Sequence, residues 1–254
     1  MCTIAFLVDI VAGAPLVLAA NRDELFARPT RPPEVLDRLS DGRVTVGGVD
    51  ELSGGTWLAI RSDGVFAAVT NQRTLSPAPT GVRSRGLAVR ELAMADDQDT
   101  FVRAIDPTQY ASMNLAWGRA GAVRLAYARH EGTLDIVELT RGIHVLANDR
   151  LDGIQYPRAA RFANALRASS LAWPSIAAEL PPLLADGTTS EPLPDSQLPP
   201  DLARAVTAIC ITSPTYGTRS STILALAPGH VLGFLHADGP PSSAAFVDRM
   251  ELFR

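Results

Sequence analysis

The sequence contains no lysine: apart from its histidines, every basic side chain is an arginine. A Schiff-base lysine, a phosphate-loop lysine and a kinase-type lysine are therefore all excluded. Cysteine is nearly as scarce, because Cys2 and Cys210 are the only two in 254 residues. Two cysteines cannot form a disulfide framework, and they fit a reducing compartment.

A basic surface and a long hydrophobic segment are also missing. The formal net charge of −4 and the isoelectric point near 5.6 give no footprint for nucleic acid or an anionic membrane. Residues 4–20 lack the basic start of a signal peptide, and Asp9 and Gly13-Ala14-Pro15 interrupt their apolar run. We therefore expect two strands there, no transmembrane segment and a cytoplasmic location. Nothing in the sequence specifies an oligomeric state.

Motifs for metals and cofactors are absent as well. The histidines show no metal-ligand spacing, and the glycine pairs at 47–48 and 54–55 match no phosphate- or dinucleotide-binding fingerprint. We expect no metal and no cofactor.

Short apolar runs bounded by Gly, Pro, Asp or Asn dominate the chain, and such runs predict strands. Helical periodicity appears over 84–106, from Pro157 onward and over 174–185. In the helix from Pro157, we expect Phe162 and Leu166 to face the core and Arg158, Arg161 and Arg167 to face water. Residues 186–201 read as a proline-rich surface loop. The expected strands are 2–10, 15–21, 56–61, 65–70, 114–118, 122–128, 133–139, 142–147, 204–213, 220–227, 230–237 and 244–253.

Strands and helices follow one another in blocks rather than in regular alternation. This order disfavours a doubly wound parallel sheet and favours an α+β fold, with two antiparallel sheets packed on each other and helices outside. Residues 2–254 are expected to form a single domain, in which the first strand, apolar on both faces, is central.

The first residues could carry chemistry. Met1 is usually removed when a small residue follows, which would leave Cys2 with both a thiol and a free α-amine. The amine titrates near 7.7–8.0 and the thiol near 8.5, so one can accept a proton from the other near neutral pH. This pairing is that of an N-terminal nucleophile. Cys210, within the apolar stretch Ala208–Ile211, reads instead as a buried, inert thiol.

Four polar residues end the second predicted strand, at Asn21-Arg22-Asp23-Glu24. They are either a strand end reaching water or a cluster delivered to the same end of the sheet as Cys2. Alternation places Asn21 and Asp23 on one face and Arg22 on the other. Asp23 could then accept a hydrogen bond from the α-amine of Cys2 and hold it in place.

Three further residues sit where substrate groups could be bound. Asn71 and Asn148 each follow a predicted strand, and their amides could donate to an oxyanion or simply form turns. Arg219, between two late strands, is either a solvated loop charge or a cation facing the substrate.

Several motifs in one order resemble the NRDE family, whose eukaryotic members are called transport and Golgi organisation protein two. The family is placed among the N-terminal nucleophile hydrolases, so the resemblance implies their four-layer α-β-β-α sandwich, in agreement with the fold inferred from the strand order. The matching motifs are Met1-Cys2-Thr3, Leu18-Ala19-Ala20-Asn21-Arg22-Asp23-Glu24, Arg28-Pro29-Thr30, Gly54-Gly55-Thr56-Trp57-Leu58-Ala59-Ile60, Val69-Thr70-Asn71, Ser84-Arg85-Gly86 and Tyr216-Gly217-Thr218-Arg219-Ser220.

A more distant similarity, to the choloylglycine hydrolase and penicillin V acylase group, implies residue roles. That group usually has an arginine three residues before its aspartate, where this chain has Ala20. Arg22 sits between Asn21 and Asp23 instead and is kept as a candidate, although strand alternation points it the other way. By this resemblance the nucleophile is Cys2, the carboxylate Asp23, the oxyanion-hole amide Asn71, the substrate-side amide Asn148 and the late arginine Arg219.

These observations favour a cysteine amidase that cleaves a non-peptide carbon–nitrogen bond of a small acyl amide through a thioester. The alternative is a non-catalytic binding or trafficking protein on the same fold, with haem or a lipid-like molecule as its hydrophobic ligand. A third hypothesis is a β-rich protein without an active site. Neither nucleic acid nor a membrane is an expected partner.

Overall fold

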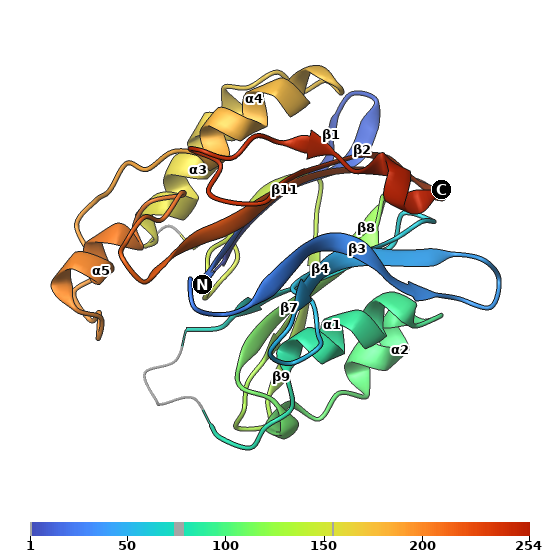
Figure 1. Cartoon of the computed structure of the whole chain (residues 1–254), viewed down its shortest axis with the longest axis horizontal. Coiled ribbons are helices and arrows are strands. Elements are labelled where there is room, and N and C mark those ends of the chain that lie inside the picture. The colour runs from blue at the N-terminus through green and yellow to red at the C-terminus, as the bar shows by residue number, and fades with distance from the viewer. Residues whose placement is uncertain (1, 74–78, 154) are drawn as a thin grey trace. The chain divides into compact units, whose positions relative to one another are not determined.

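The computed structural model describes residues 2–73, 79–153 and 155–254 (Figure 1). By internal contacts the chain divides into two compact units. The first comprises the chain up to Ala27 with Arg141–Ala225 and Gly233–Arg249, and the second comprises Arg28–Thr140, Leu226–Leu232 and Met250–Arg254.

A six-stranded sheet contains the start of the chain. β1 lies between β10 and β2, pairs antiparallel with both, and is buried from Thr3 to Val8. An apolar strand with partners on both sides and no face in water is central, as its composition predicted. The strands, in spatial order, are β10 (Gly142–Leu146), β1 (Cys2–Val11), β2 (Ala14–Leu25), β11 (Tyr216–Ala227), β12 (His230–Ala237) and β13 (Val247–Asp248).

The second sheet is an antiparallel meander in which each strand pairs with the next along the chain. Its strands are β3 (Thr30–Arg38), β4 (Val44–Asp50), β5 (Leu58–Arg61), β6 (Phe66–Asn71), β7 (Met113–Arg119), β8 (Ala122–Ala128) and β9 (Leu134–Leu139).

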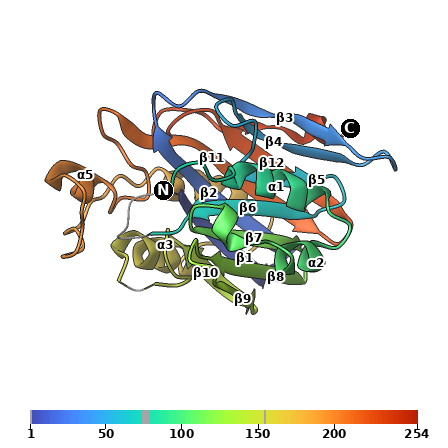
Figure 2. The ribbon, with the colours of Figure 1, turned by 90° about the horizontal axis from the view of Figure 1, so that it is seen from below.

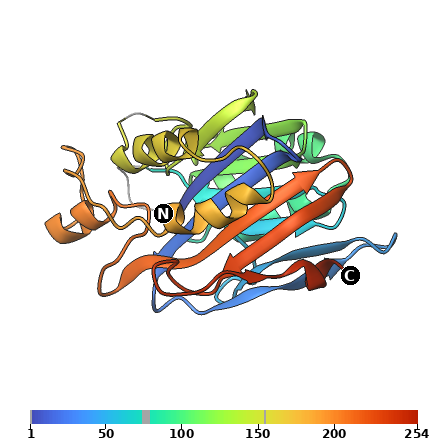
Figure 3. The ribbon, with the colours of Figure 1, turned by 90° about the horizontal axis from the view of Figure 1, so that it is seen from above.

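Helices cover one face of the six-stranded sheet. α3 (Pro157–Arg167) packs on β10 and β1, and α4 (Ser175–Leu184) packs on β2, as Figure 3 shows. α3 begins at Pro157, as predicted, since the fixed φ of proline suits the first helical turn. Residues 186–199 form neither helix nor strand, and α5 (Pro200–Ala205) follows them.

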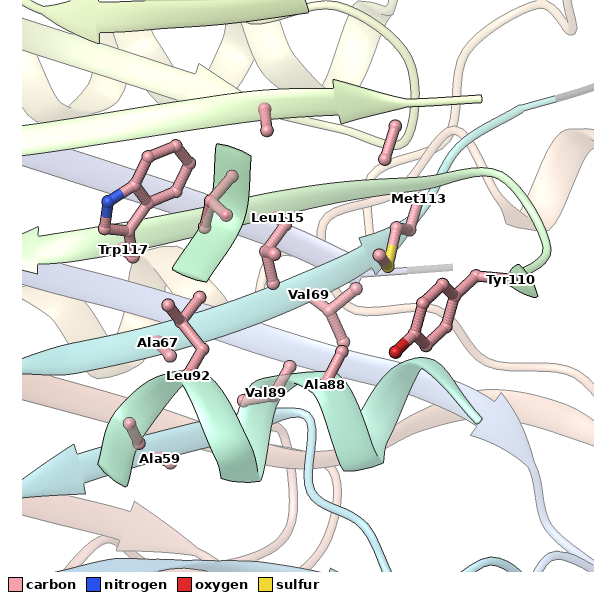
Figure 4. Close-up of a cluster of buried hydrophobic side chains, with 14 residues drawn as sticks. Ala59, Ala67, Val69, Ala88, Val89, Leu92, Tyr110, Met113, Leu115 and Trp117 are labelled. Carbon is pink, nitrogen blue, oxygen red and sulfur yellow. The ribbon is translucent and has the colours of Figure 1, made fainter. Parts of the chain in front are cut away.

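The second sheet has its own helical cover. α1 (Arg85–Met94) packs on β5 and β6, with α2 (Gln98–Arg103) beside it (Figure 2). Leu92 of α1 points toward Ala67 of β6, Ala88 of α1 lies against Val69, and Trp117 of β7 belongs to the same buried cluster (Figure 4). These two helices account for the helical pattern over 84–106, with a break at Ala95–Asp97.

Two strands were missed by the sequence analysis. β3 and β4 lie between the strands expected at 15–21 and 56–61, where no strand was predicted, and β3 carries Pro32 and Pro33. Proline cannot donate to a sheet ladder, but β3 is an edge strand, and its pairing with β4 shifts register between Arg31 and Glu34. An edge position with a bulge tolerates a sequence that reads as a loop.

Two predicted strands were wrong. The strand expected at 204–213 is replaced by the end of α5 and a series of turns. Pro200 and Asp201 in the first turn and Arg204 in the last turn suit a helix, since the acidic side chain lies near the positive end of the dipole and the basic one near the negative end. The strand expected at 244–253 shrinks to β13 and a short 3₁₀ helix at Met250–Phe253.

Within the described residues, no helix combines the length and apolarity needed to span a membrane.

Candidate active site

The hairpin of β1 and β2 places Cys2 directly opposite Arg22, and Thr3 opposite Asn21. Directly opposed residues of an antiparallel pair project from the same face of the sheet. Arg22, buried at 6 % exposure, therefore lies on the face of Cys2, while Asn21 and Asp23 lie on the other. The alternation of Asn21, Arg22 and Asp23 is as predicted, but the expectation that Arg22 points away from the catalytic group is wrong, because the pairing register makes Arg22 the cross-strand neighbour of Cys2.

The Cys2 thiol is free and half-buried. Burial raises the pKa of this thiol, the Asp23 carboxylate raises it further, and the Asp23 backbone N–H and Arg22 lower it. The net effect is upward, so the thiol is protonated at neutral pH. A nucleophilic role for Cys2 consequently requires a base that removes the proton.

Asp23 is fully buried and holds a specific set of contacts. Thr218 of β11 donates to Oδ1 at 2.7 Å, Nη1 of Arg158 lies 3.6 Å from Oδ2, and the Tyr216 hydroxyl donates to the Asp23 carbonyl oxygen at 3.2 Å. Burial raises the pKa of Asp23 to about 6, and Arg158 is the strongest influence opposing that rise. Burial, with Asp23 and Cys2, also raises the pKa of Tyr216. Asp23 is therefore a carboxylate that titrates close to neutral pH.

Asn148 follows β10 in the left-handed region, at φ 73°, and is buried. Asparagine adopts this conformation more readily than most residues, which suits it to the turn after the strand. Its Oδ1 accepts a hydrogen bond from Nη2 of Arg158. Asn148 and Asp23, taken from distant parts of the sequence, thus share one guanidinium.

Arg158 is the residue that the sequence analysis misplaced. It was expected to face water, but it is only 3 % exposed in the first turn of α3. A signal was available: Arg158 precedes Phe162 by four residues and Leu166 by eight, the spacing of one helical stripe, and both are fully buried. Arg161 is also not simply solvated, since it bonds to Asp186 and to the carbonyl oxygen of Thr207.

Arg219 connects β11 to the chain after β2. Its guanidinium donates to the carbonyl oxygens of Leu25 and Phe26, and it lies 6.0 Å from the centre of the Phe26 ring. Asn71 belongs to the second unit, where it ends β6 opposite Met113. Cys210 is buried at 2 % exposure, in a bend rather than in the expected strand.

The removal of Met1 concerns a residue outside those the structure describes. Among the described residues, no group of three or more His, Cys, Asp or Glu side chains is arranged to hold a metal ion.

Solved structures similar to this chain include penicillin V acylase from Agrobacterium tumefaciens, with a TM-score of 0.55 at 11 % identity over 98 % of this chain and 87 % of that one. A mutant conjugated bile acid hydrolase from Clostridium perfringens also matches with a TM-score of 0.55, at 10 % identity over 99 % of this chain and 93 % of that one. A Caenorhabditis elegans orthologue of N-acylethanolamine-hydrolyzing acid amidase matches with a TM-score of 0.55 at 11 % identity, over 89 % of this chain and 92 % of that one. These matches confirm the expected α+β fold, that of the N-terminal nucleophile hydrolases.

Sequence comparison identifies the family. The Transport and Golgi organization protein 2 homologues of Bos taurus and Homo sapiens are each 28 % identical over 237 residues, which is 85 % of this chain and 84 % of theirs. The model of the Transport and Golgi organisation 2 family matches residues 1–235. With its motifs, its fold and this match in agreement, the chain belongs to the Transport and Golgi organisation 2 family.

Proposed function

We propose that this protein is an N-terminal cysteine nucleophile hydrolase that cleaves the amide bond of a small acyl amide through a thioester. The observation that carries the proposal is the β1–β2 hairpin, which sets Cys2 opposite Arg22 and next to the buried Asp23. Names of fold neighbours support the reaction class, because they include an acylase, a hydrolase and an acid amidase. A cytoplasmic setting is part of the proposal, since Cys2 and Cys210 are both free thiols.

In the proposed reaction, Met1 has been removed and the α-amine of Cys2 takes the proton of its own thiol. The sulfur attacks the carbonyl carbon, forming a carbon–sulfur bond and an oxyanion. The intermediate collapses, the carbon–nitrogen bond breaks, and the leaving amine takes the proton back from the α-ammonium. Water then attacks the thioester, with the α-amine again accepting a proton, and the acid and the free thiol are released.

The remaining site residues have assigned parts in this proposal. The Asp23 carboxylate holds the α-ammonium as it forms, which favours proton removal from a thiol whose pKa is raised. Asn71 donates to the oxyanion, and Asn148 and Arg219 bind the substrate. Arg22, on the face of Cys2, offers a positive charge near the thiolate.

The test compares Cys2→Ala and Cys2→Ser with Cys210→Ala on a panel of acyl amides and acyl-homoserine lactones. Both Cys2 variants should fold normally and lose turnover, and intact-protein mass should show an acyl group on Cys2 with a slow substrate. Asn71→Ala should lower the rate by roughly 10²–10³, the effect of losing one oxyanion donor. Cys210→Ala should retain turnover, since that thiol is buried elsewhere.

Processing is checked separately by intact mass and by iodoacetamide labelling with peptide mapping. The mature protein should lack Met1, and Cys2 should react before Cys210, because only Cys2 is part-exposed. Retained Met1, or preferential labelling of Cys210, would contradict the assignment of Cys2 as the nucleophile.

A carrier of haem or a lipid-like molecule is the other hypothesis, and the names of the curated relatives refer to transport. The hydrolase proposal is wrong if three results occur together: no substrate of the panel is hydrolysed, no acyl-enzyme forms, and haem binds at micromolar or tighter affinity. A Soret shift on Cys2→Ala would then show whether the thiolate is a haem ligand.

A further inference from the structure

We propose that Arg158 is a positioning residue of this site: its guanidinium holds Asp23 in the charged form and turns the amide of Asn148 so that its N–H groups face away from the guanidinium. The inference rests on the proposed function for its catalytic meaning. Its physical content can be tested without turnover.

The geometry is that of one fork between two partners. Nη1 of Arg158 lies 3.6 Å from Oδ2 of Asp23, and Nη2 donates to Oδ1 of Asn148. Asp23 lies near the C-terminal end of β2, and Asn148 follows the C-terminal end of β10. Arg158, on α3, therefore joins the ends of these two strands. α3 packs on β10 and β1, and the position of Arg158 in its first turn, on the stripe of Phe162 and Leu166, directs the side chain inward.

The ionised state of the Asp23 carboxyl group depends on nearby positive charge. The titratable and charged groups acting on it come from four elements: the Cys2 thiol from β1, Arg22 from β2, Tyr216 from β11 and Arg158 from α3. Burial raises the pKa of Asp23 to about 6, and Arg158 opposes the rise more than Arg22 or the Thr218 hydroxyl does. Without Arg158, a larger fraction of Asp23 would be protonated at neutral pH, and only the charged fraction can hold an ammonium ion. The N-terminal ammonium also lowers the pKa of Asp23, and after removal of Met1 the α-amine of Cys2 would carry that charge.

The orientation of the Asn148 amide follows from hydrogen-bond chemistry. A guanidinium only donates, so the atom of Asn148 that meets Nη2 must be the oxygen. The amide nitrogen, with its two N–H groups, is then turned away from Arg158. An asparagine fixed in this way is an N–H donor rather than a carbonyl acceptor, which is what a substrate carbonyl requires.

The placement of Arg158 is costly for stability alone. Its side chain is 4 % exposed, and Nη1 makes no hydrogen bond within the described chain, although it is paired with Asp23. A buried ion pair with an incompletely satisfied donor is often no more stable than an apolar replacement. A role in the site accounts for this arrangement better than a role in packing.

The experiment follows the carboxyl carbon of Asp23 by NMR in protein labelled with ¹³C at aspartate, titrated between pH 4 and 9, with Asp23→Asn to assign the signal. In wild type the signal should titrate near pH 6. In Arg158→Met the pKa should rise to about 7 or higher, since an adjacent arginine typically lowers an aspartate pKa by about 1–3. Arg167→Met is the matched control, because Arg167 lies exposed at the end of the same helix.

Arg158→Lys separates the two parts of the proposal and keeps the test decisive if Arg158→Met does not fold. The ammonium keeps the charge near Asp23, so its pKa should stay near 6, but a single point charge cannot replace the fork. The side-chain amide signals of Asn148 should therefore shift in ¹H–¹⁵N spectra of Arg158→Lys and stay unchanged in Arg167→Met.

An Asp23 titration that is the same in wild type and Arg158→Met would overturn the charge role. Unchanged Asn148 amide signals in Arg158→Lys would overturn the orienting role. Both NMR readouts are independent of turnover. If no acyl amide of the panel is hydrolysed but the predicted NMR shifts are observed, the proposed hydrolase is contradicted and the electrostatic role of Arg158 is supported. With an active enzyme, the acidic limb of kcat/KM should move upward in Arg158→Met with the Asp23 pKa.

Discussion

Burial of the Asp23 carboxylate makes stability depend on pH in an unusual direction. Most shifted acids of this protein, such as Asp186 and Asp97, have lowered pKa values in the folded state, and they favour folding as pH rises. The folded pKa of Asp23 is raised to about 6 from an ordinary value of 3.8. A raised pKa means that the folded state binds the proton more tightly than the unfolded state does. The contribution of Asp23 is therefore full below about pH 4 and is lost as pH rises through 6.

Asp23→Asn should remove this contribution. Between pH 4 and 7, the free energy of unfolding of the wild type should fall by about 2 kcal/mol relative to that of the variant, since one pKa unit corresponds to about 1.4 kcal/mol and this range covers most of the titration. Urea unfolding across this range measures the difference. Asp96→Asn, at a side chain that is 95 % exposed, should keep the wild-type pH dependence. Parallel curves for wild type and Asp23→Asn would show that Asp23 does not titrate in this range.

At the scale of elements, the end of β2 docks on the helical layer through one buried amide. Nδ2 of Asn21 donates to the carbonyl oxygens of Leu184 and Ile209 at 2.9 Å each, and Oδ1 accepts from Ser221 at 2.5 Å. Leu184 ends α4, so one of these bonds satisfies a helix-terminal carbonyl that has no partner within the helix. Asn21 therefore connects β2, α4 and β11, whereas Asp23, two residues later on the same face, takes part in the candidate site.

Asn21→Ala should destabilise the protein by about 2–4 kcal/mol, because two buried carbonyls and one buried hydroxyl would lose their partner. Chemical unfolding monitored by circular dichroism measures this loss. Asn164→Ala, on the exposed side of α3, should change stability by no more than about 0.5 kcal/mol. Equal effects of the two substitutions would show that the Asn21 amide does not hold α4 on the sheet.

The whole molecule is built without lysine, and its ion pairs consequently use arginine forks. In the second unit Arg28 bonds both carboxylate oxygens of Asp50, and Arg90 does the same with Asp37. Planar bidentate pairs of this kind match carboxylate geometry in a way that a lysine ammonium cannot. A second consequence is chemical: the α-amine is the only aliphatic amine that the sequence supplies.

Acetylation of amines is therefore a site-specific test of the proposed proton acceptor. With the Cys2 thiol masked as a mixed disulfide and then released, acetylation should add one group, mapped to Cys2 in the mature protein. An acetylated nitrogen cannot accept a proton, so turnover should fall by roughly 10²–10⁴, the usual contribution of a general base. The control is protein that is masked and released without acetylation. Full turnover with the acetyl group in place would contradict a role for the α-amine.

Local patterns sufficed for much of the fold and for part of the site. Apolar runs with turn residues between them predicted ten strands that are present, namely β1, β2 and β5 to β12, because short apolar runs and the turn residues beside them specify strands locally. The helix beginning at Pro157 was predictable for the same reason. The nearness of Asp23 to Cys2 follows from the pairing of the first two strands, which are neighbours along the chain. The motif resemblance predicted the family, which the whole-chain match shows.

Only the tertiary structure decided which distant segments meet. Arg22 shares the face of Cys2 because of the β1–β2 register, which one strand's alternation cannot specify. Arg158 is buried because Asp23, far away in sequence, and Asn148, at the end of the preceding strand, supply its partners, and a lone arginine would otherwise lie in water. β3 is a strand because β4 pairs with it at a sheet edge that tolerates its two prolines. In each case the free energy that decides the outcome comes from a partner outside the local sequence.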